Sequence, residues 1–194
     1  MKTTGKIVTL SGISGIGKSF LKSYVLENLE DFVSLISVTT RSRRINEQDG
    51  VDKFFYSQDQ FLQEYSDGKL CAVNNVFGKL YGYKKEQLDL CYQGVNLITE
   101  LYYRNVREFK LAFPNVLSVY VLPLSVQETK KKLIERNLKS DDLDRRMSDI
   151  DAEISFYYEN KEIFDATIEN DYSLETCLYL TKLISEKIRG NSDV

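Results

Sequence analysis

The chain has 194 residues, of which 42% are hydrophobic, enough for one globular domain with a sizeable core. Its 26 lysines and arginines are outnumbered by 29 aspartates and glutamates, so the net charge of −3 gives no global attraction to nucleic acid or to an anionic membrane. The chain has no histidine, which excludes a Ser-His-Asp site, and its 3 cysteines show no zinc-binding or disulfide pattern.

Four apolar runs rich in β-branched residues predict β-strands at residues 7–10, 33–38, 95–99 and 116–122. Each run lies close to a stretch with the three- and four-residue spacing of a helix. This alternation is typical of a parallel sheet covered by helices, so the expected fold class is α/β.

A glycine-rich segment follows the first predicted strand. Directly after it, Leu21, Tyr24 and Val25 lie on one face of a predicted helix, so the segment joins a strand to a helix. Between residues 41 and 83 the pattern changes to short aromatic and polar segments with turn signals, which predicts an inserted α+β lobe.

The C-terminal half carries clear helix signals. Ser125 and Glu128 form a capping-box pattern that predicts a helix start after the strand at residues 116–122. Apolar side chains at helical spacing predict two more helices, at residues 144–158 and 174–188.

The segment GISGIGKSF at residues 12–20 matches the phosphate-loop pattern, a glycine followed after four residues by Gly17, Lys18 and Ser19. Backbone N–H groups at its glycines can wrap the phosphates of a nucleotide, and the helix N-terminus adds a partial positive charge. We expect Lys18 to reach the outer phosphates and Ser19 to bind Mg²⁺. The alternative is a glycine-rich turn that binds nothing. The residues expected to contact the nucleotide are Gly12, Ser14, Gly15, Ile16, Gly17, Lys18, Ser19 and Phe20.

Three arginines follow the second predicted strand, in the segment VTTRSRR at residues 38–44. Their position corresponds to the open end of a parallel sheet, where ligands bind. Arginine forks suit a second phosphate. A solvated basic turn or a nucleic-acid patch is the alternative.

Several motifs, in order, resemble the guanylate kinase family. SGISGIGKSF is similar to the family's SGPSGxGKST, SVTTRSRRINEQDGVDKFF resembles SVTTRxxRxGExxGxDYxF, and FGKLYGY resembles FGNxYGT. Further on, RRMSDIDAEISFY and IENDYSLE resemble KRxxxAxxEixxY and VNDDLE. The resemblance extends from Gly5 to Lys187. It implies a P-loop NTPase-type parallel sheet flanked by helices, with an acceptor-binding lobe and a helical lid, and ATP with Mg²⁺ as cofactors.

The resemblance also implies roles for particular residues. Arg41, Arg44 and Tyr81 would hold the phosphate of the acceptor, with Ser37 nearby. Arg136 and Arg146 would be lid arginines that close on the ATP phosphates, and Asn170 would contact the adenine. Taken alone, the arginines have a simpler interpretation as surface charges, and Tyr81 as core packing. Phosphoryl transfer needs positioning and charge neutralisation more than a strong base, so the expected catalytic residues are Lys18, Arg41, Arg44, Arg136 and Arg146.

The sequence departs from the family pattern at four positions. Ala72 stands where the family reads guanine with a glutamate, and Tyr83 stands where a smaller hydroxyl residue meets the guanine carbonyl. Lys53 replaces a tyrosine that grips the acceptor phosphate and could serve there as a cation. Glu100 replaces an aspartate and could steer Mg²⁺ through water, the alternative being a solvent-facing strand end.

These features lead to three functional hypotheses. The leading one is ATP-dependent phosphorylation of a nucleoside monophosphate, with GMP or dGMP as the candidate acceptor. A second keeps the chemistry but changes the acceptor to an unusual nucleotide or a phosphorylated sugar such as ribose bisphosphate. A third is a catalytically silent binding module of the same fold, whose phosphate loop would typically be degraded.

We expect one domain over residues 1–194, with a core at residues 5–40 and 84–188, a lobe at 41–83 and a lid at 136–146. No apolar run approaches membrane-spanning length. The expected protein is therefore cytoplasmic, binds neither nucleic acid nor membrane, and is a monomer or a homodimer.

Overall fold

The structure, a computed structural model, describes residues 4–113, 115–135 and 140–189. The chain divides into two compact units. The first contains Asp31–Thr99 and Arg107–Val116 with the N-terminal segment up to Ile7, and the second contains Val8–Glu30, Glu100–Val106 and the chain from Leu117 onward. The lobe predicted at residues 41–83 falls within the first unit, and the predicted phosphate loop falls within the second.

A five-stranded sheet gives the protein its α/β class. The strand order is β2-β7-β1-β8-β9, and the pairs β2–β7 and β8–β9 are parallel. The strands are β1 (Ile7–Ser11), β2 (Phe32–Ser34), β7 (Asn96–Glu100), β8 (Val116–Pro123) and β9 (Ala166–Asn170). Every residue of β1 is buried, as expected for a strand covered on both faces. The strands predicted at residues 7–10, 95–99 and 116–122 are confirmed.

The single strand predicted at residues 33–38 is wrong in its extent. β2 ends at Ser34, and a separate strand β3 (Ser37–Thr39) belongs to a second sheet. Between them, Ile36 donates its N–H to Gln87 Oε1 and accepts from Gln87 Nε2 through its carbonyl, each at 2.9 Å. One glutamine side chain therefore replaces the strand pairing and lets the chain pass from one sheet to the other.

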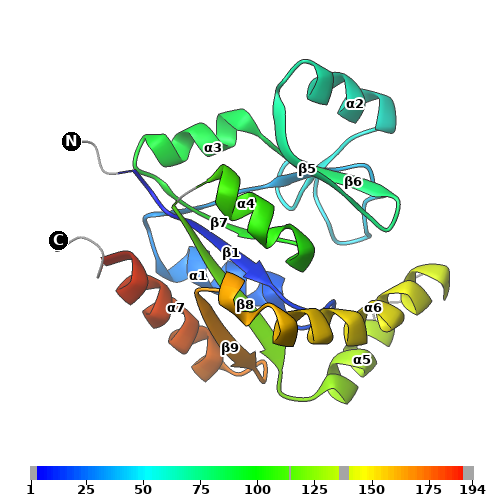
Figure 1. The fold of residues 1–194 in the computed structure, drawn as a ribbon, viewed down its shortest axis with the longest axis vertical. Helices are drawn as coiled ribbons and strands as arrows, with labels where there is room; N and C mark the ends of the chain where they lie inside the picture. The colour runs from blue at the N-terminus through cyan, green and yellow to red at the C-terminus, as the bar shows by residue number, and fades with distance from the viewer. Residues whose placement is uncertain (1–3, 114, 136–139, 190–194) are drawn as a thin grey trace. The chain divides into compact units, whose positions relative to one another are not determined.

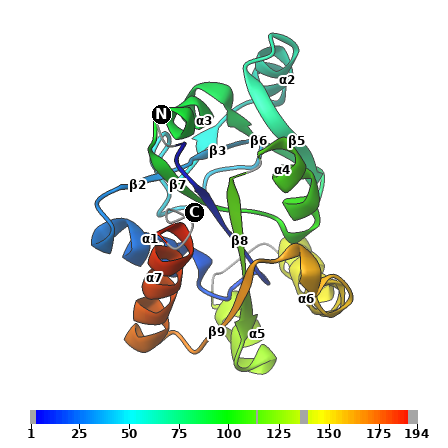
Figure 2. The same cartoon turned by 60° about the vertical axis from the view of Figure 1, so that its left-hand side comes forward.

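Helices cover the sheet strands, and neighbouring helices pair in both ribbon views. In the second unit, α1 (Lys18–Asn28) lies beside α7 (Leu174–Arg189), and α5 (Val126–Ile134) contacts α6 (Ser140–Glu159) (Figures 1 and 2). Ser125 Oγ accepts from the Glu128 N–H at 3.2 Å, so the predicted cap of α5 is confirmed. The remaining helices are α3 (Lys85–Tyr92), α4 (Val106–Ala112) and the 3₁₀ turns Tyr103–Asn105 and Lys161–Ile163.

The second sheet, in the first unit, has the strand order β4-β3-β6-β5. It comprises β3 with β4 (Phe54–Phe55), β5 (Leu70–Val76) and β6 (Lys79–Lys84), and helix α2 (Gln58–Ser66) packs on β5. Val38, Phe61 and Leu70 are its buried centre, and Val73 is among the partly buried side chains around them. Strands and a helix together confirm the predicted α+β character of this lobe.

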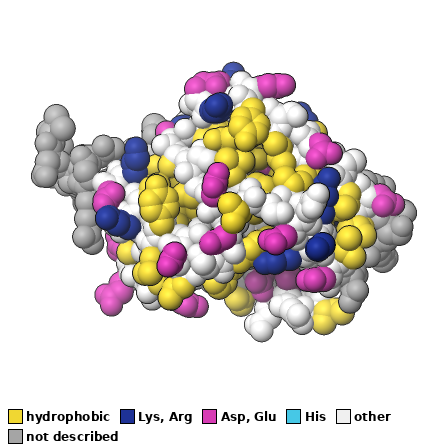
Figure 3. Space-filling view, turned by 90° about the horizontal axis from the view of Figure 1, so that it is seen from below, with side chains coloured by type: hydrophobic (Ala, Val, Ile, Leu, Met, Phe, Trp, Pro, Cys, Tyr) yellow, Lys and Arg dark blue, Asp and Glu magenta, His cyan; other side chains and the backbone are white. Residues whose placement is uncertain are grey.

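The surface agrees with the mixed charge of the sequence. Acidic and basic side chains are interspersed on the face drawn in Figure 3. Within the described ranges, no helix combines the length and the apolar character needed to cross a membrane.

Replacing Phe61 by alanine should destabilise the first unit strongly. The Phe61 side chain is fully buried under the second sheet, so truncation leaves a cavity and should lower the free energy of unfolding by about 3–5 kcal/mol. Leu62→Ala is the matched control, because Leu62 is the next residue of α2 and is 47% exposed, and it should cost about 0.5 kcal/mol. Urea denaturation of both variants measures the difference, and equal losses would contradict this assignment of the core.

Candidate functional site

The glycine-rich segment forms a tight loop between β1 and α1. Gly12 has a φ of +144°, and a Cβ atom there would lie 2.4 Å from the Val121 carbonyl oxygen. Gly17 has a φ of +87°, and a Cβ atom there would lie 2.9 Å from Asn170 Nδ2. Both positions therefore require glycine, and neither brings a side chain into the loop.

Helix α1 begins with an open N-terminus. Gly17 is its N-cap residue in the left-handed conformation, and no side chain of the described residues caps it. The first-turn N–H groups of a helix lack intrahelical partners, and the helix dipole favours an anion at that end. The loop and helix end therefore fit the phosphate groups of a nucleotide, as the sequence predicted.

Lys18 holds its ammonium group against the loop. Its Nζ atom donates to the carbonyl oxygen of Gly12 and, at 3.0 Å, to that of Ile13. The predicted cation is therefore at the loop and close to where the outer phosphates would bind.

The end of β9 and the residues that follow it support the loop from the other end. Asn170 Nδ2 donates to the Ile16 carbonyl at 2.6 Å, and the Tyr172 hydroxyl donates to the Gly15 carbonyl at 2.8 Å. Asn170 is 1% exposed, and Lys132 Nζ lies 2.9 Å from the centre of the Tyr172 ring. Asn170 therefore positions the loop in this structure, and its predicted contact with adenine stays a prediction.

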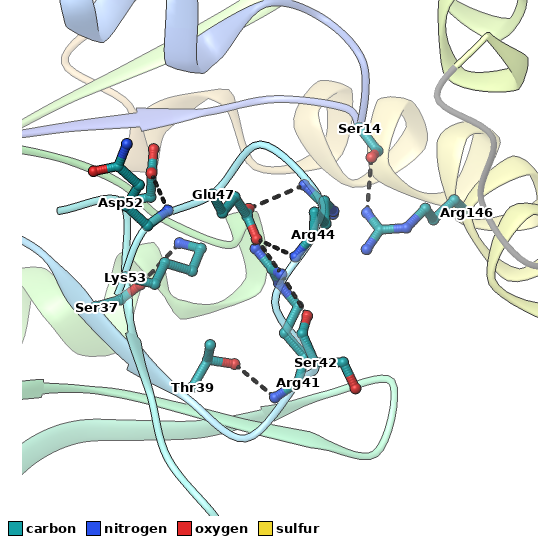
Figure 4. Close-up of polar contacts among 11 residues, drawn as sticks. Ser14, Ser37, Thr39, Arg41, Ser42, Arg44, Glu47, Asp52, Lys53 and Arg146 are labelled. Carbon is teal, nitrogen blue, oxygen red and sulfur yellow. Dashed lines mark hydrogen bonds and ion pairs between the residues drawn. The ribbon is translucent and has the colours of Figure 1, made fainter. Parts of the chain in front are cut away.

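One of the two predicted lid arginines contacts the loop. Arg146 Nη1 donates to Ser14 Oγ at 2.9 Å (Figure 4). Its Nε atom is buried and has no partner in the described part of the chain, so this guanidinium has a donor to give to a phosphate. Arg136, the other predicted lid arginine, lies outside the described residues.

Glu153 of α6 places a carboxyl group beside the loop. The residue is 4% exposed, and its Oε1 atom lacks a hydrogen-bond partner among the described residues. Burial raises the pKa of Glu153 to about 8, although the charge of Lys18 and a hydrogen bond from the Gly12 backbone act in the opposite direction. The shift favours the protonated form, which repels a phosphate less than a carboxylate would.

The segment after β7 approaches the start of the loop. The Leu101 N–H donates to the Leu10 carbonyl at 3.0 Å, and Ser11 Oγ donates to the Leu101 carbonyl at 2.9 Å. Glu100, half-buried, is the last residue of β7, and Ser19 is an exposed residue of the first turn of α1.

These two oxygen-bearing side chains fit Mg²⁺, which binds through one or two carboxylates and keeps phosphate and water ligands. No group of three potential metal ligands occurs among the described histidine, cysteine, aspartate and glutamate residues. Ser19 and Glu100 would therefore hold the ion together with the nucleotide phosphates, and their predicted metal role stays a prediction.

A polar cluster fixes the chain beyond Glu100. The Tyr103 hydroxyl donates to Asp149 Oδ1 at 3.3 Å, and Arg104 Nε donates to the Tyr103 hydroxyl at 3.0 Å. Burial raises the pKa of Asp149, with the bond from Tyr103 and the charge of Arg104 opposing that shift. The centre of the Tyr102 ring lies 4.6 Å from that of the Tyr103 ring.

In the first unit, two of the predicted arginines gather around Glu47. Arg41 donates to both carboxylate oxygens, at 2.7 and 2.5 Å, the Arg44 N–H donates at 2.9 Å, and Arg44 Nη1 lies 3.6 Å away (Figure 4). Burial alone would raise the pKa of Glu47, but these contacts outweigh it and lower the pKa to about 2. The carboxylate therefore stays charged and orients the Arg41 fork.

Three more residues predicted to bind the acceptor lie in the first unit, namely Ser37, Lys53 and Tyr81. Tyr81 is among the groups that raise the pKa of the Arg41 guanidinium, after burial, which lowers it, and Glu47, which raises it. Lys53 Nζ donates to Ser37 Oγ at 2.9 Å (Figure 4), so Lys53 places a cation at the position where the family pattern has a tyrosine. The structure thus brings Arg41 together with Tyr81, and Lys53 together with Ser37.

The two predicted base-reading positions differ in what they offer. Tyr83 is 3% exposed, its hydroxyl lies 3.2 Å from Thr99 Oγ1, and its ring packs edge-on against Phe109 at 5.6 Å. Ala72 has a φ of +48° within a β-bulge of β5. Neither presents the carboxylate or small hydroxyl of the family pattern.

Three residues of these sites were missed from the sequence. Glu47 and Glu153 both lie inside segments that resemble family motifs, and each coincides with a glutamate of the pattern, which is a signal that could have found them. Tyr172 carried no such signal, because its contact with Gly15 joins residues 157 positions apart.

The chain is similar to known proteins along nearly its whole length. A sequence model of the guanylate kinase family matches residues 4–187. The chain is 33% identical over 180 residues to guanylate kinase from Bacillus subtilis (strain 168), which covers 91% of this chain and 86% of that protein. It is 30% identical over 183 residues to guanylate kinase from Trichodesmium erythraeum (strain IMS101), with coverage of 93% and 96%. The crystal structure of guanylate kinase from Anaplasma phagocytophilum matches with a TM-score of 0.75 at 24% identity, covering 96% of this chain and 88% of that one, which shows a shared fold.

Replacing Glu153 by glutamine should change how stability depends on pH. The folded state raises the pKa of Glu153 from 4.5 to about 8, so in that interval the folded protein binds a proton that the unfolded chain releases. Stability of the parent protein should therefore fall with rising pH across this window relative to Glu153→Gln, by at most about 1.4 kcal/mol per pH unit. Thermal unfolding of both proteins from about pH 5 to pH 8 measures this, and a constant difference would contradict the raised pKa.

Proposed function

The chain belongs to the guanylate kinase family and is an ATP-dependent phosphotransferase, and we propose that its acceptor is GMP, with dGMP accepted alongside it. The observation that carries the proposal is the phosphate loop, which retains Lys18, Ser19 and a helix N-terminus that no described side chain caps. Mg²⁺ is the proposed metal cofactor, and the cytoplasm the proposed location.

The residues proposed to bind ATP, the phosphate donor, lie in the second unit. Loop N–H groups and the end of α1 bind the ATP phosphates, while Lys18 and Arg146 neutralise charge on the outer ones. When bound, Mg²⁺ neutralises further phosphate charge. Ser19 and Glu100 are the residues proposed to hold it.

The acceptor half lies in the first unit. Arg41, Arg44 and Tyr81 bind the phosphate of GMP, and Lys53 adds a fourth donor beside Ser37. Glu47 holds Arg41 through two hydrogen bonds, so the guanidinium is oriented before the acceptor arrives, which lowers the entropy cost of binding.

Transfer then requires only alignment and charge neutralisation. A phosphate oxygen of GMP attacks the γ-phosphorus of ATP as the bond to the bridging oxygen of ADP breaks, and the products are ADP and GDP. The developing charge lies on phosphate oxygens, where cationic groups and N–H donors stabilise it. The residues proposed to supply them are Lys18, Arg41, Arg44, Arg136 and Arg146.

The intact loop favours this enzyme over a catalytically silent binding module. A module that recognises only a phosphorylated partner has no need of a left-handed glycine at the start of α1 or of a lysine folded onto the loop.

Lys18→Ala should remove most of the activity. The ammonium group is the cation closest to the loop carbonyls, and its loss should lower kcat at least about 100-fold in an ADP-release assay with GMP. Lys22→Ala, which removes the same charge one turn further along α1, is the matched control and should retain activity. Full activity of Lys18→Ala would refute the donor site.

Arg41→Ala should weaken the binding of GMP, the acceptor, rather than the binding of ATP, the donor. It removes a charged donor and leaves the Glu47 carboxylate with only its contacts to Arg44, so KM for GMP should rise by about 10- to 100-fold. KM for ATP should stay within about twofold. Arg43→Ala tests the same segment at an exposed arginine, and a similar rise in that variant would count against a specific role of Arg41.

A further inference from the structure

Asn74 of β5 carries a hydrogen-bond acceptor that the described part of the protein does not use. Its Oδ1 atom is buried and has no partner there, whereas its Nδ2 atom donates to the Ala72 carbonyl at 3.2 Å. The neighbouring Asn75 is exposed, and its Oδ1 accepts from the Gly78 N–H at 2.8 Å in the hairpin turn. Of the two asparagines, Asn74 is therefore the one whose oxygen is left for another donor.

A β-bulge decides which face of the sheet Asn74 occupies. Cys71 pairs with Tyr83, and Asn74 pairs with Tyr81. Between these two pairs β5 advances by three residues while β6 advances by two, so β5 contains one extra residue. Directly opposed residues of antiparallel strands project to the same face. In a regular strand Asn74 would face away from the side of Cys71 and Tyr83. The extra residue returns it to that side, while Val73 packs against the buried centre around Phe61.

The face that carries Asn74 is the one that carries acceptor residues. Thr39 and Ser37 of β3 pair with Tyr81 and Tyr83 of β6, so all four lie on it together with Asn74. Tyr81 also interacts electrostatically with the Arg41 guanidinium. An acceptor whose phosphate binds Arg41 and Tyr81 therefore extends over a face on which Asn74 is directly opposite Tyr81.

Other side chains at the base-reading positions offer no comparable acceptor. Ala72 has only a methyl group. The Tyr83 hydroxyl is buried against Thr99 Oγ1 at 3.2 Å. Asn74 Nδ2 donates to the Ala72 carbonyl, so Oδ1 is the amide atom left without a partner among the described residues, and this oxygen can accept an N–H but cannot donate.

Resting on the proposed function, we infer that Asn74 is the specificity-determining residue for the base and that the acceptor class is 6-oxopurine nucleoside monophosphates. The amide oxygen accepts the N1–H of the ring, which guanine and hypoxanthine share. A single neutral oxygen recognises the additional 2-amino group of guanine less well than a carboxylate with two oxygens would. IMP is therefore phosphorylated with an efficiency close to that of GMP, whereas AMP, which has a lone pair at N1, is rejected.

The test measures kcat/KM for GMP, IMP and AMP with ATP and Mg²⁺ in an ADP-release assay. For the parent protein, GMP and IMP should agree within about tenfold, and AMP should be at least about 100-fold worse. A preference for GMP over IMP greater than about 100-fold would overturn the inference.

Three variants assign the effect to a residue. Asn74→Ala should lower kcat/KM for GMP and IMP together by about tenfold or more, through KM rather than kcat. Asn75→Ala is the matched control, because that side chain serves the turn, and it should leave base preference unchanged. Unchanged kinetics of Asn74→Ala on both purines would overturn the inference.

Ala72→Glu keeps the test decisive if Asn74→Ala fails to fold. A carboxylate in the bulge should raise the ratio of kcat/KM for GMP over IMP by about tenfold, since it accepts from both N1–H and the 2-amino group. An unchanged ratio in a folded Ala72→Glu protein would count against this placement of the base. Binding of ATP without turnover of any nucleoside monophosphate is a different result, because it would refute the proposed acceptor itself.

Discussion

The direction of the carbonyl groups in the phosphate loop is the constraint on which the donor site depends. Side-chain donors engage the carbonyls of Gly12, Ile13, Gly15 and Ile16, two from Lys18 and one each from Tyr172 and Asn170. A peptide unit is planar and trans, so a carbonyl fixed in one direction turns the N–H of the same unit the opposite way. The loop therefore presents N–H groups to an anion because residues from α1, from the end of β9 and from the segment after it occupy its carbonyls.

In each unit the carboxyl group beside the proposed phosphate site is either paired with arginines or buried. A net charge of −3 is therefore compatible with the binding of two anionic substrates. In the first unit, Glu47 balances Arg41 and Arg44, so the cations are oriented without excess repulsion between them. In the second unit, burial raises the pKa of Glu153 and so favours the protonated form, which adds less negative charge beside the phosphates. Burial and local contacts thus shift the pKa of the same residue type in opposite directions at the two sites.

The sequence predicted what depends on short-range spacing. The phosphate loop, the cap at Ser125 and three of the central strands are set by residues within a few positions of one another, and the structure has them where the pattern indicated. The division of residues 33–38 was not predictable in this way, because it depends on Gln87, about fifty residues away. The support of the loop by Tyr172 has the same character, since no local pattern marks a tyrosine that caps a distant carbonyl.

The departures from the family pattern in the acceptor unit are of two kinds: one is at a position that binds phosphate through charge, and the others are at positions that recognise the base through directional hydrogen bonds. A phosphate dianion is bound mainly by charge, so a lysine at position 53 would still attract the phosphate where the family pattern has a tyrosine. A base is recognised by hydrogen bonds whose donors and acceptors must match in position. When Ala72 removes such an acceptor, a charge elsewhere cannot replace it, and only a group on the same face of the sheet can. The bulge that brings Asn74 beside Tyr81 meets that geometric requirement, so the altered positions in the acceptor unit form one linked change in base recognition.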